Sequence, residues 1–143
     1  MINIGYGINL CSKLLKNKLN KELEKEGITA AQFAVLKDIQ INNTNLKNTT
    51  AVLIADRLKM DKPTISGIVN RLVSKDYIKK IPNLKDKRSS ILVLTEKCNE
   101  KLDRFEEINE EIIKSITKGI ENKELEAIDK VLNKIIDTLK EEI

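Results

Sequence analysis

Apolar residues recur every three or four positions along most of the chain, which is the spacing of helices with one buried face. The pattern predicts a first helix over residues 2–26, a second that opens at Thr29, a third over 51–58 and a fourth after Asp61. The same spacing returns after Thr95, the expected cap of a fifth helix, and continues into a last helix. The pattern therefore favours a mainly α-helical protein.

The helical spacing is interrupted once, between the fourth helix and the fifth. A β-prone run begins with Tyr77, Ile78 and Ile81 and breaks at Pro82-Asn83, and a second run occupies Ile91–Leu94. The turn between them, residues 85–88, holds three cations and one acid. Two short strands around a basic tip predict a wing, a small β-hairpin that can reach a minor groove of DNA.

Local signals mark where the helices start and stop. Thr29-Ala30-Ala31-Gln32 has the form of a capping box. Gly27 is the expected stop of the first helix. Asn42–Thr50 is predicted to be a polar loop, and Asn122 is the expected cap of the last helix, whose apolar positions reach Ile143.

The fourth helix has two contrasting faces. Asp61 is a good N-cap, and Pro63 fits a first turn because its missing N–H is not needed there. The predicted buried stripe is Ile65, Ile68, Val69 and Leu72. The opposite face is small, polar and basic, and it comprises Lys62, Thr64, Ser66, Gly67, Asn70 and Arg71. A face of this kind, with no acidic residue, suits the major groove of DNA.

The composition favours a soluble helical protein of one domain. The chain has 143 residues, of which 34% are charged and 3% are aromatic. No apolar run is long enough for a membrane span, and the N-terminus lacks the basic start of a signal peptide, so we expect a cytoplasmic protein. Cys11 and Cys98 should then be reduced thiols.

Positive charge is concentrated on the predicted helix-turn-helix and wing. Residues 57–88 hold ten Lys/Arg and three Asp/Glu, a net charge of +7, whereas residues 96–143 hold nine and fourteen, a net charge of −5. A basic patch of this kind binds a polyanion by releasing counterions, which favours nucleic acid. The alternative is that lysine is merely abundant and that these charges form solvated faces.

The sequence contains none of the residue sets that mark an enzyme. It has no histidine, which removes the commonest general base and metal ligand. It lacks a Ser/His/Asp set, a glycine-rich phosphate loop and a Cys-x-x-Cys pair. The acidic pairs Glu106/Glu107 and Glu110/Glu111 are better read as the solvated face of the fifth helix. We therefore predict no enzymatic activity, no cofactor and no metal.

The first helix and the last two carry more apolar surface than a small winged domain can cover. Residues 1–143 are expected to form one chain with a winged helix-turn-helix over 29–95. We expect the helices of residues 1–26 and 96–143 to form a bundle that joins two copies of this chain. A dimer would also hold two recognition helices at a fixed spacing on two half-sites. The alternative is that these helices pack only within one chain.

Four stretches follow one another in a set order: Thr29-Ala30-Ala31-Gln32-Phe33, Leu53–Leu58 with Met60–Ser66, Asp86-x-Arg88, and Leu94-Thr95. Together they resemble the MarR (multiple antibiotic resistance regulator) family of winged-helix transcription factors, and the resemblance covers nearly the whole chain. Two positions depart from the family's usual glycine. Asp76 can adopt a left-handed conformation, and Cys98 can act as a small hydrophobe in a helix.

The resemblance implies a homodimer that binds a palindromic operator in double-stranded DNA, usually as a repressor. The fourth helix would enter the major groove and the wing the minor groove, where Asp86 would orient the wing and Arg88 probe the groove. The residues assigned to DNA in this way are Lys62, Pro63, Thr64, Ser66, Gly67, Asn70, Arg71, Lys85, Asp86, Lys87 and Arg88. Other roles stay open: Arg71 could brace the wing, Asp86 and Arg88 could form only a structural ion pair, and Thr64 and Ser66 could contact phosphates alone.

The resemblance also implies that a small lipophilic or anionic effector can release the DNA. Its pocket would be lined by the first helix, Phe33, Leu36 and the start of the fifth helix. Some family members sense peroxides through an N-terminal cysteine, which lies farther from the T-x-x-Q box than Cys11 does. Because Cys11 falls on the apolar stripe, we expect an inert thiol. The competing functional hypothesis is a winged-helix module that binds a protein partner instead of DNA.

Overall fold

The structure is a computed structural model that describes residues 3–142. Its elements are α1 (Ile4–Glu24), α2 (Ala30–Thr44), α3 (Ala51–Leu58), α4 (Lys62–Ser74), β1 (Ile78–Pro82), β2 (Ser90–Leu94), α5 (Glu96–Ile116) and α6 (Asn122–Glu141). They confirm the mainly α-helical fold with one hairpin. The chain forms two compact units, residues 1–110 and 111–143, and each is described by itself. Ile143, the last position of the predicted apolar stripe, lies outside the described residues.

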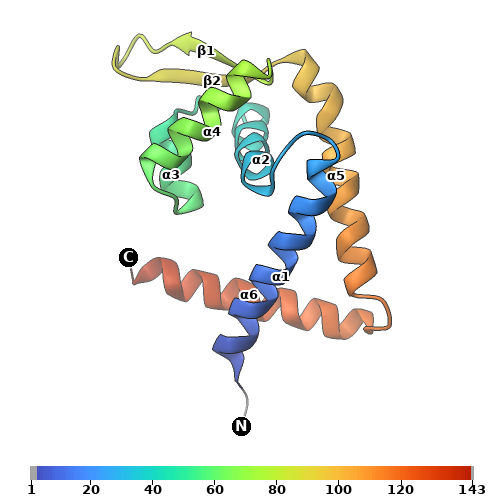
Figure 1. Ribbon diagram of the computed structural model, residues 1–143. Helices are drawn as coiled ribbons and strands as arrows, with labels where there is room; N and C mark the ends of the chain where they lie inside the picture. The colour runs from blue at the N-terminus through green and yellow to red at the C-terminus, as the bar shows by residue number, and fades with distance from the viewer. Residues whose placement is uncertain (1–2, 143) are drawn as a thin grey trace. The chain divides into compact units, whose positions relative to one another are not determined.

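Helix α2 is the centre of the first unit. It contacts α1, α3, α4 and β2, and Figure 1 shows it between the α3–α4 pair and α5. Its Val35, Leu36 and Ile39 are fully buried. Phe33 of α2 meets Phe105 of α5 edge to face, with ring centroids 6.3 Å apart. The core that supports the helix-turn-helix is therefore built around this helix.

The predicted start and stop signals are mostly confirmed. Thr29 Oγ1 accepts from Gln32 N at 3.0 Å, and Gln32 Oε1 accepts from Thr29 N at 3.2 Å, which completes the capping box. Gly27 follows α1 with a φ of +76°, and Asp76 adopts the expected left-handed conformation with a φ of +61°. Thr95 caps α5 by accepting from the backbone N–H of Cys98 at 3.1 Å.

The prediction that the polar loop begins at Asn42 is wrong, because α2 continues to Thr44. Asn42 Nδ2 donates to the Asp38 carbonyl oxygen at 2.8 Å. This hydrogen bond runs back by one helical turn and satisfies the amide within the helix. A polar residue of this kind is therefore compatible with the last turn of α2.

The prediction that Asn122 caps α6 is also wrong. Asn122 is already helical, and the cap residue is Glu121, whose side chain makes no capping hydrogen bond. The Glu121 carbonyl oxygen accepts from Glu124 N at 3.0 Å and from Leu125 N at 3.1 Å. The backbone of the preceding turn therefore starts this helix without help from a side chain.

The apolar residues of α1 and α6 are largely exposed in the single chain. Only Leu23 is buried in α1, and none of the described residues of α6 is buried. The large apolar side chains left exposed are Ile4, Tyr6, Ile8, Leu10 and Leu14 of α1 and Ile128, Val131, Leu132, Ile136 and Leu139 of α6. Even so, within residues 3–142 no helix is both long and apolar enough to cross a membrane.

The two cysteines lie in different environments, and both are free thiols. Cys98 is fully buried, and its burial raises the pKa of the thiol to about 11. It is therefore protonated near neutral pH and packs as the small hydrophobe expected. Cys11 is exposed in the single chain, because the apolar stripe of α1 is uncovered at this end of the helix. The expectation that its thiol is inert stays a prediction.

Candidate nucleic-acid interface

Helix α4 begins with a side-chain cap that fixes its first turn. Asp61 accepts from Thr64 N at 2.8 Å and from the Thr64 hydroxyl at 2.9 Å. These hydrogen bonds hold the pKa of the Asp61 carboxyl below its ordinary value. Pro63 stands in the first turn, as expected from its missing N–H. Since the Thr64 hydroxyl donates to the cap, this side chain positions the start of the helix.

The two faces of α4 separate as the sequence predicts. The stripe that faces the core is no more than 7% exposed, and it comprises Ile65, Ile68, Val69 and Leu72. The outward face is exposed, and it comprises Lys62, Thr64, Ser66, Gly67, Asn70 and Arg71. A Cβ added at Gly67 would meet nothing within 4 Å beyond its own helix backbone, so packing does not require a glycine there. The outward face offers small polar groups and two cations.

The wing is an antiparallel hairpin anchored at its base. Its register runs from Ile78 opposite Leu94 to Pro82 opposite Ser90. The base is held by Ile78 and Leu92, which are 2% and 1% exposed. In Figure 1 the hairpin extends as an arm whose tip points away from α5. The basic tip is therefore exposed while the base of the hairpin belongs to the core.

Hydrogen bonds within the tip fix the backbone that carries its cations. Asp86 Oδ1 accepts from Arg88 N at 3.0 Å and from Arg88 Nε at 3.3 Å. Asn83 Oδ1 accepts from Lys85 N at 3.1 Å, and Asn83 Nδ2 donates to Ser89 Oγ at 3.0 Å. The Arg88 side chain is still 93% exposed, and such an ion pair contributes little stability. Asp86 therefore directs Arg88 without burying it.

A hollow of about 320 Å³ lies between α3, α4 and the wing. Ser66 and Asn70 of α4, Lys80 of β1 and Arg88 of the tip all contribute to its lining. Lys80 Nζ donates to Asn70 Oδ1 at 3.2 Å, which joins the wing to the outward face of α4. Two cations and several polar groups around a space of this size suit an anionic group such as a phosphate.

Sequence reasoning missed three residues of this surface: Lys80, Asn83 and Ser89. The strand alternation contained a signal for Lys80, because it lies two residues after the buried Ile78 and so shares its side of β1. Asparagine after proline is a frequent turn former, which was a signal for Asn83. Nothing in the sequence pointed to Ser89, since its partner is another side chain across the tip.

The structure brings only some of the predicted residues together. Ser66, Asn70 and Arg88 are brought together at the hollow, whereas Lys85 and Lys87 stand on the exposed tip. Among residues 3–142, no ion pair involves Arg71. The structure thus gives no acidic partner through which this arginine would brace the wing.

A second hollow, of about 620 Å³, lies where α1 meets the start of α2. Most of its exposed lining surface is apolar, although polar and charged side chains contribute to it, and the lining comprises Lys16, Asn20, Glu24, Gly27, Ile28, Thr29, Ala31, Gln32 and Lys75. The Lys75 ammonium donates to the Gly27 carbonyl oxygen at its edge. Phe33 and Leu36 do not line this hollow, because both side chains are buried in the core. This hollow is therefore not the pocket predicted between the dimer helices and the winged region, and that pocket stays a prediction.

Comparison with known protein families finds a match to the part of the chain that contains α4 and the tip of the wing. A model of the MarR family matches residues 26–89. The chain is 26% identical over 143 aligned positions to the multiple antibiotic resistance protein MarR of Escherichia coli K12, covering 95% of this chain and 92% of that protein. The family model and this relative together support a MarR-family winged-helix transcriptional regulator. The matched range includes every DNA-binding residue that the sequence predicts, from Lys62 to Arg88.

Solved MarR-family structures share this fold. A variant of Escherichia coli MarR, complexed with operator DNA, matches with a TM-score of 0.80 and 27% identity over 94% of each chain. The DNA complex of MepR from Staphylococcus aureus matches with a TM-score of 0.83 over 96% of this chain and 99% of that chain. The second protein is only 22% identical, so its likeness concerns the fold alone.

Proposed function

We propose that this protein is a cytoplasmic, homodimeric repressor of the MarR family that binds a palindromic operator in double-stranded DNA. The main support is the exposed, acid-free face of α4 beside the basic tip of the wing. Residues 57–88 carry a net charge of +7, which comes from ten Lys/Arg and three Asp/Glu. Cations clustered in this way bind DNA by releasing its counterions. The operator-DNA complex of the E. coli relative is consistent with this role.

In this proposal α4 lies in the major groove. Asn70 and Arg71 are the residues on its outward face that can read base edges. Because Asn70 Oδ1 accepts from Lys80, the amide Nδ2 group is the part left to donate to a base or a phosphate. Thr64 contributes mainly through the cap. The face therefore reads few bases directly, and much of the specificity comes from half-site spacing and DNA shape.

The wing contributes contacts outside the major groove. Arg88 extends from the tip into the adjacent minor groove, whose negative potential attracts arginine, and Lys85 and Lys87 accompany it. Lys80 binds a backbone phosphate at the hollow beside Asn70. These contacts position the protein on the duplex, while base contacts specify the sequence.

The homodimer is proposed because two helices present apolar faces that the single chain leaves exposed. Ile128, Val131 and Leu139 of α6 are each more than half exposed, and so are Ile4 and Leu14 of α1. Exposed apolar surface on this scale marks an interaction site. A second copy would cover these faces and set the spacing of two α4 helices on a palindrome.

An effector would bind best at the hollow between α1 and α2. Lys16, Lys75 and Glu24 line it, and most of its remaining exposed surface is apolar. This chemistry fits a small, largely apolar molecule that carries one anionic group. Occupation at this place would act on the junction between α1, the proposed dimer helix, and α2, the centre of the core.

The function can be tested by capturing fragments of the source genome with the purified protein, followed by gel shifts. We expect a small set of fragments that share a palindrome, one of them upstream of the protein's own gene or a neighbouring one. Arg88→Ala should weaken binding to these fragments by about tenfold or more, as loss of an arginine contact of roughly 1–3 kcal/mol implies. Its melting temperature should stay nearly unchanged, because the side chain is 93% exposed.

Lys101→Ala is the matched control, since it removes one exposed cation from α5, outside α4 and the wing. It should leave the affinity for the captured fragments unchanged. If no genomic fragment is enriched, the result would support the alternative hypothesis that this surface binds a protein partner instead of DNA. If Arg88→Ala lowers the melting temperature strongly, the residue is a structural brace.

A further inference from the structure

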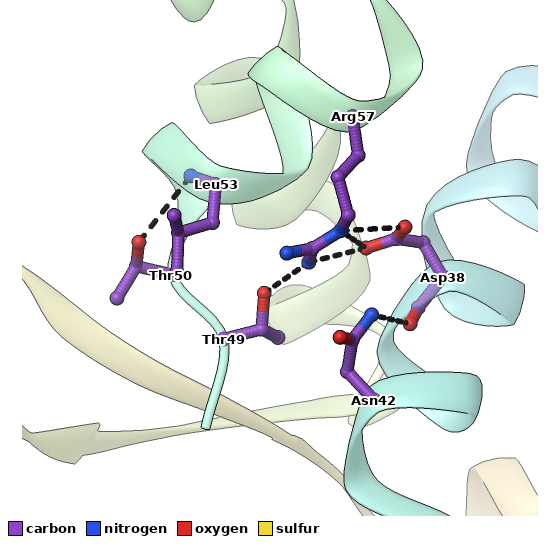
Figure 2. A network of polar contacts seen from close by, with 6 residues as sticks. All are labelled: Asp38, Asn42, Thr49, Thr50, Leu53 and Arg57. Carbon is purple, nitrogen blue, oxygen red and sulfur yellow. Dashed lines mark hydrogen bonds and ion pairs between the residues drawn. The ribbon is translucent and has the colours of Figure 1, made fainter. Parts of the chain in front are cut away.

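Arg57, in the last turn of α3, makes the best-connected polar contact of the winged region. Its Nε donates to both carboxylate oxygens of Asp38 at 3.0 and 3.2 Å, and its Nη2 donates to Asp38 Oδ2 at 2.7 Å. The same Nη2 also donates to the hydroxyl of Thr49. Figure 2 shows the guanidinium between Asp38 of α2 and Thr49 of the loop. The Arg57 side chain thus joins α3 to both α2 and the α2–α3 loop.

The loop residue in this contact leads directly to the wing. Thr49 is fully buried, and its carbonyl oxygen accepts from Leu92 N at 2.9 Å. Leu92 is a buried residue of β2 and pairs with Lys80 on β1. The chain of contacts therefore runs from α2 through Arg57 and Thr49 to the strands of the wing.

The contact is better formed than most surface ion pairs. The Asp38 side chain is 11% exposed and that of Arg57 is 33% exposed. Two nitrogens of Arg57 engage the carboxylate, a forked geometry that lysine cannot reproduce. The hydrogen bonds that Arg57 donates to Asp38 raise the pKa of the guanidinium. Loss of Arg57 would leave the Thr49 hydroxyl without this donor inside the protein.

Helix α3 has few other means of fixing its orientation. Of its eight residues, only Ile54 and Ala55 are buried, while Val52 and Leu53 are 50% and 45% exposed. A small apolar contact leaves the angle of a helix weakly defined, and well-placed polar groups then set it. Because α3 leads into α4 through a turn of three residues, 59–61, the angle of α3 also sets that of α4.

From this geometry we infer that Arg57 is a positioning residue for DNA binding. It locks α3, the α2–α3 loop and β2 to α2, so that the outward face of α4 and the tip of the wing meet the duplex at the same time. Its charge is engaged by Asp38 and does not act on a phosphate. This inference rests on the proposed function, because it concerns how the proposed DNA-binding surface is held.

The test compares Arg57→Lys, Asp38→Asn and the double variant, with operator and scrambled duplexes and at several salt concentrations. If Arg57 positions the surface, both single variants should weaken operator binding by roughly tenfold, a size typical of coupled networks. The double variant should be no weaker than either, and the salt slope should not change. If Arg57 contacts a phosphate, Arg57→Lys should bind almost normally and Asp38→Asn should bind more tightly, which would overturn the inference.

Arg104→Gln is the matched control. Arg104 also bridges two carboxylates, Glu26 at 3.1 Å and Glu107 at 3.3 Å, but these lie on α5 and at the end of α1. Its loss should lower the melting temperature no more than Arg57→Lys does, because Arg104 is 49% exposed, and it should leave the ratio of operator to scrambled affinity unchanged. If Arg104→Gln lowered the ratio of operator to scrambled affinity as much as Arg57→Lys does, Arg57 would only stabilise the fold and would not position the DNA-binding surface.

Amide hydrogen exchange tests the same network without DNA. Arg57→Lys and Asp38→Asn should both speed exchange at Leu92 N–H, which bonds to Thr49, relative to Cys98 N–H at the start of α5. Unchanged exchange at Leu92 would overturn the inference even if DNA binding were lost. If the wild type fails to discriminate operator from scrambled DNA while Leu92 responds as expected, it is the proposed function that fails and the coupling that stands.

Discussion

Helices α4 and α6 have the same spacing of apolar residues, but their apolar faces differ in what covers them. The stripe of α4 lies against the core and is at most 7% exposed. In α6, Ile128 is 56% exposed, Leu139 is 55% exposed and none of the described residues is buried. Periodicity therefore predicts which side of a helix is apolar but not which surface will cover it.

The polar sides of the two helices differ as well. On α4 the outward face holds Lys62 and Arg71 and no acid, whereas α6 mixes acids such as Asp129 with lysines such as Lys130. A mixed face is an ordinary solvated surface, while a basic face of small side chains suits DNA. In the proposed function, the polar side of α4 meets DNA, and the apolar sides of α6 and α1 meet a second copy of the chain.

The largest effect should come from placing a charge on the apolar side of α6. We expect Ile136→Asp to abolish the dimer, because a carboxylate cannot be buried unpaired in an apolar interface. Sedimentation should then give the 16.3 kDa chain alone, and operator binding should fall to the non-specific level. Lys130→Asp, on the polar side of the same helix, should remain dimeric. A monomeric wild type, or a dimer that persists in Ile136→Asp, would mean that this face is not the interface.

The next largest effect should separate the covered stripe from the uncovered one. Leu72→Ala in α4 should lower the free energy of unfolding by about 2–5 kcal/mol, as expected for a fully buried leucine. Leu132→Ala in α6 removes a side chain that is 39% exposed and should cost clearly less in dilute protein. Its cost in urea unfolding should grow with protein concentration, as linkage to dimerisation requires. If both variants lost the same free energy of unfolding at every protein concentration, the apolar face of α6 would not be an interface between copies.

The smallest effect concerns the outward face of α4. Gly67→Ala should stabilise the folded protein by about 0.5–1 kcal/mol, because glycine is unfavourable inside a helix and the added methyl group meets nothing. It should nevertheless weaken operator binding, since DNA would approach the backbone closely here. Thermal unfolding and gel shifts on the same sample separate the two effects. Stabilisation with unchanged binding would exclude Gly67 from the DNA surface.

The sequence predicted best what is decided within a few residues. The capping box at Thr29, the cap at Asp61 and the left-handed Asp76 are local, and the structure confirms all three. The errors at Asn42 and Asn122 are also local, because asparagine suits a loop, a cap or a last helical turn equally well. Type and order of elements were predictable, and element ends were less so.

The parts of the candidate site that could not be predicted depend on contacts between distant residues. The partners Arg57 and Asp38 are 19 residues apart, and Lys80 meets Asn70 only once the wing folds back onto α4. The exposure of Cys11 likewise depends on what covers α1 and not on the apolar spacing around it. Charge and periodicity pointed to the proposed DNA-binding region, and the tertiary structure added how its pieces are held.

The most direct measurement is a fluorescence-anisotropy titration of the wild-type protein with a captured palindromic duplex and a scrambled duplex, each at several salt concentrations. We expect the palindrome to bind about 10³-fold tighter or more, with a logarithmic affinity that falls linearly with the logarithm of salt concentration and with a slope of several units. Equal, weak binding of the two duplexes at low salt would contradict sequence-specific DNA binding and would favour a protein partner for the same basic surface.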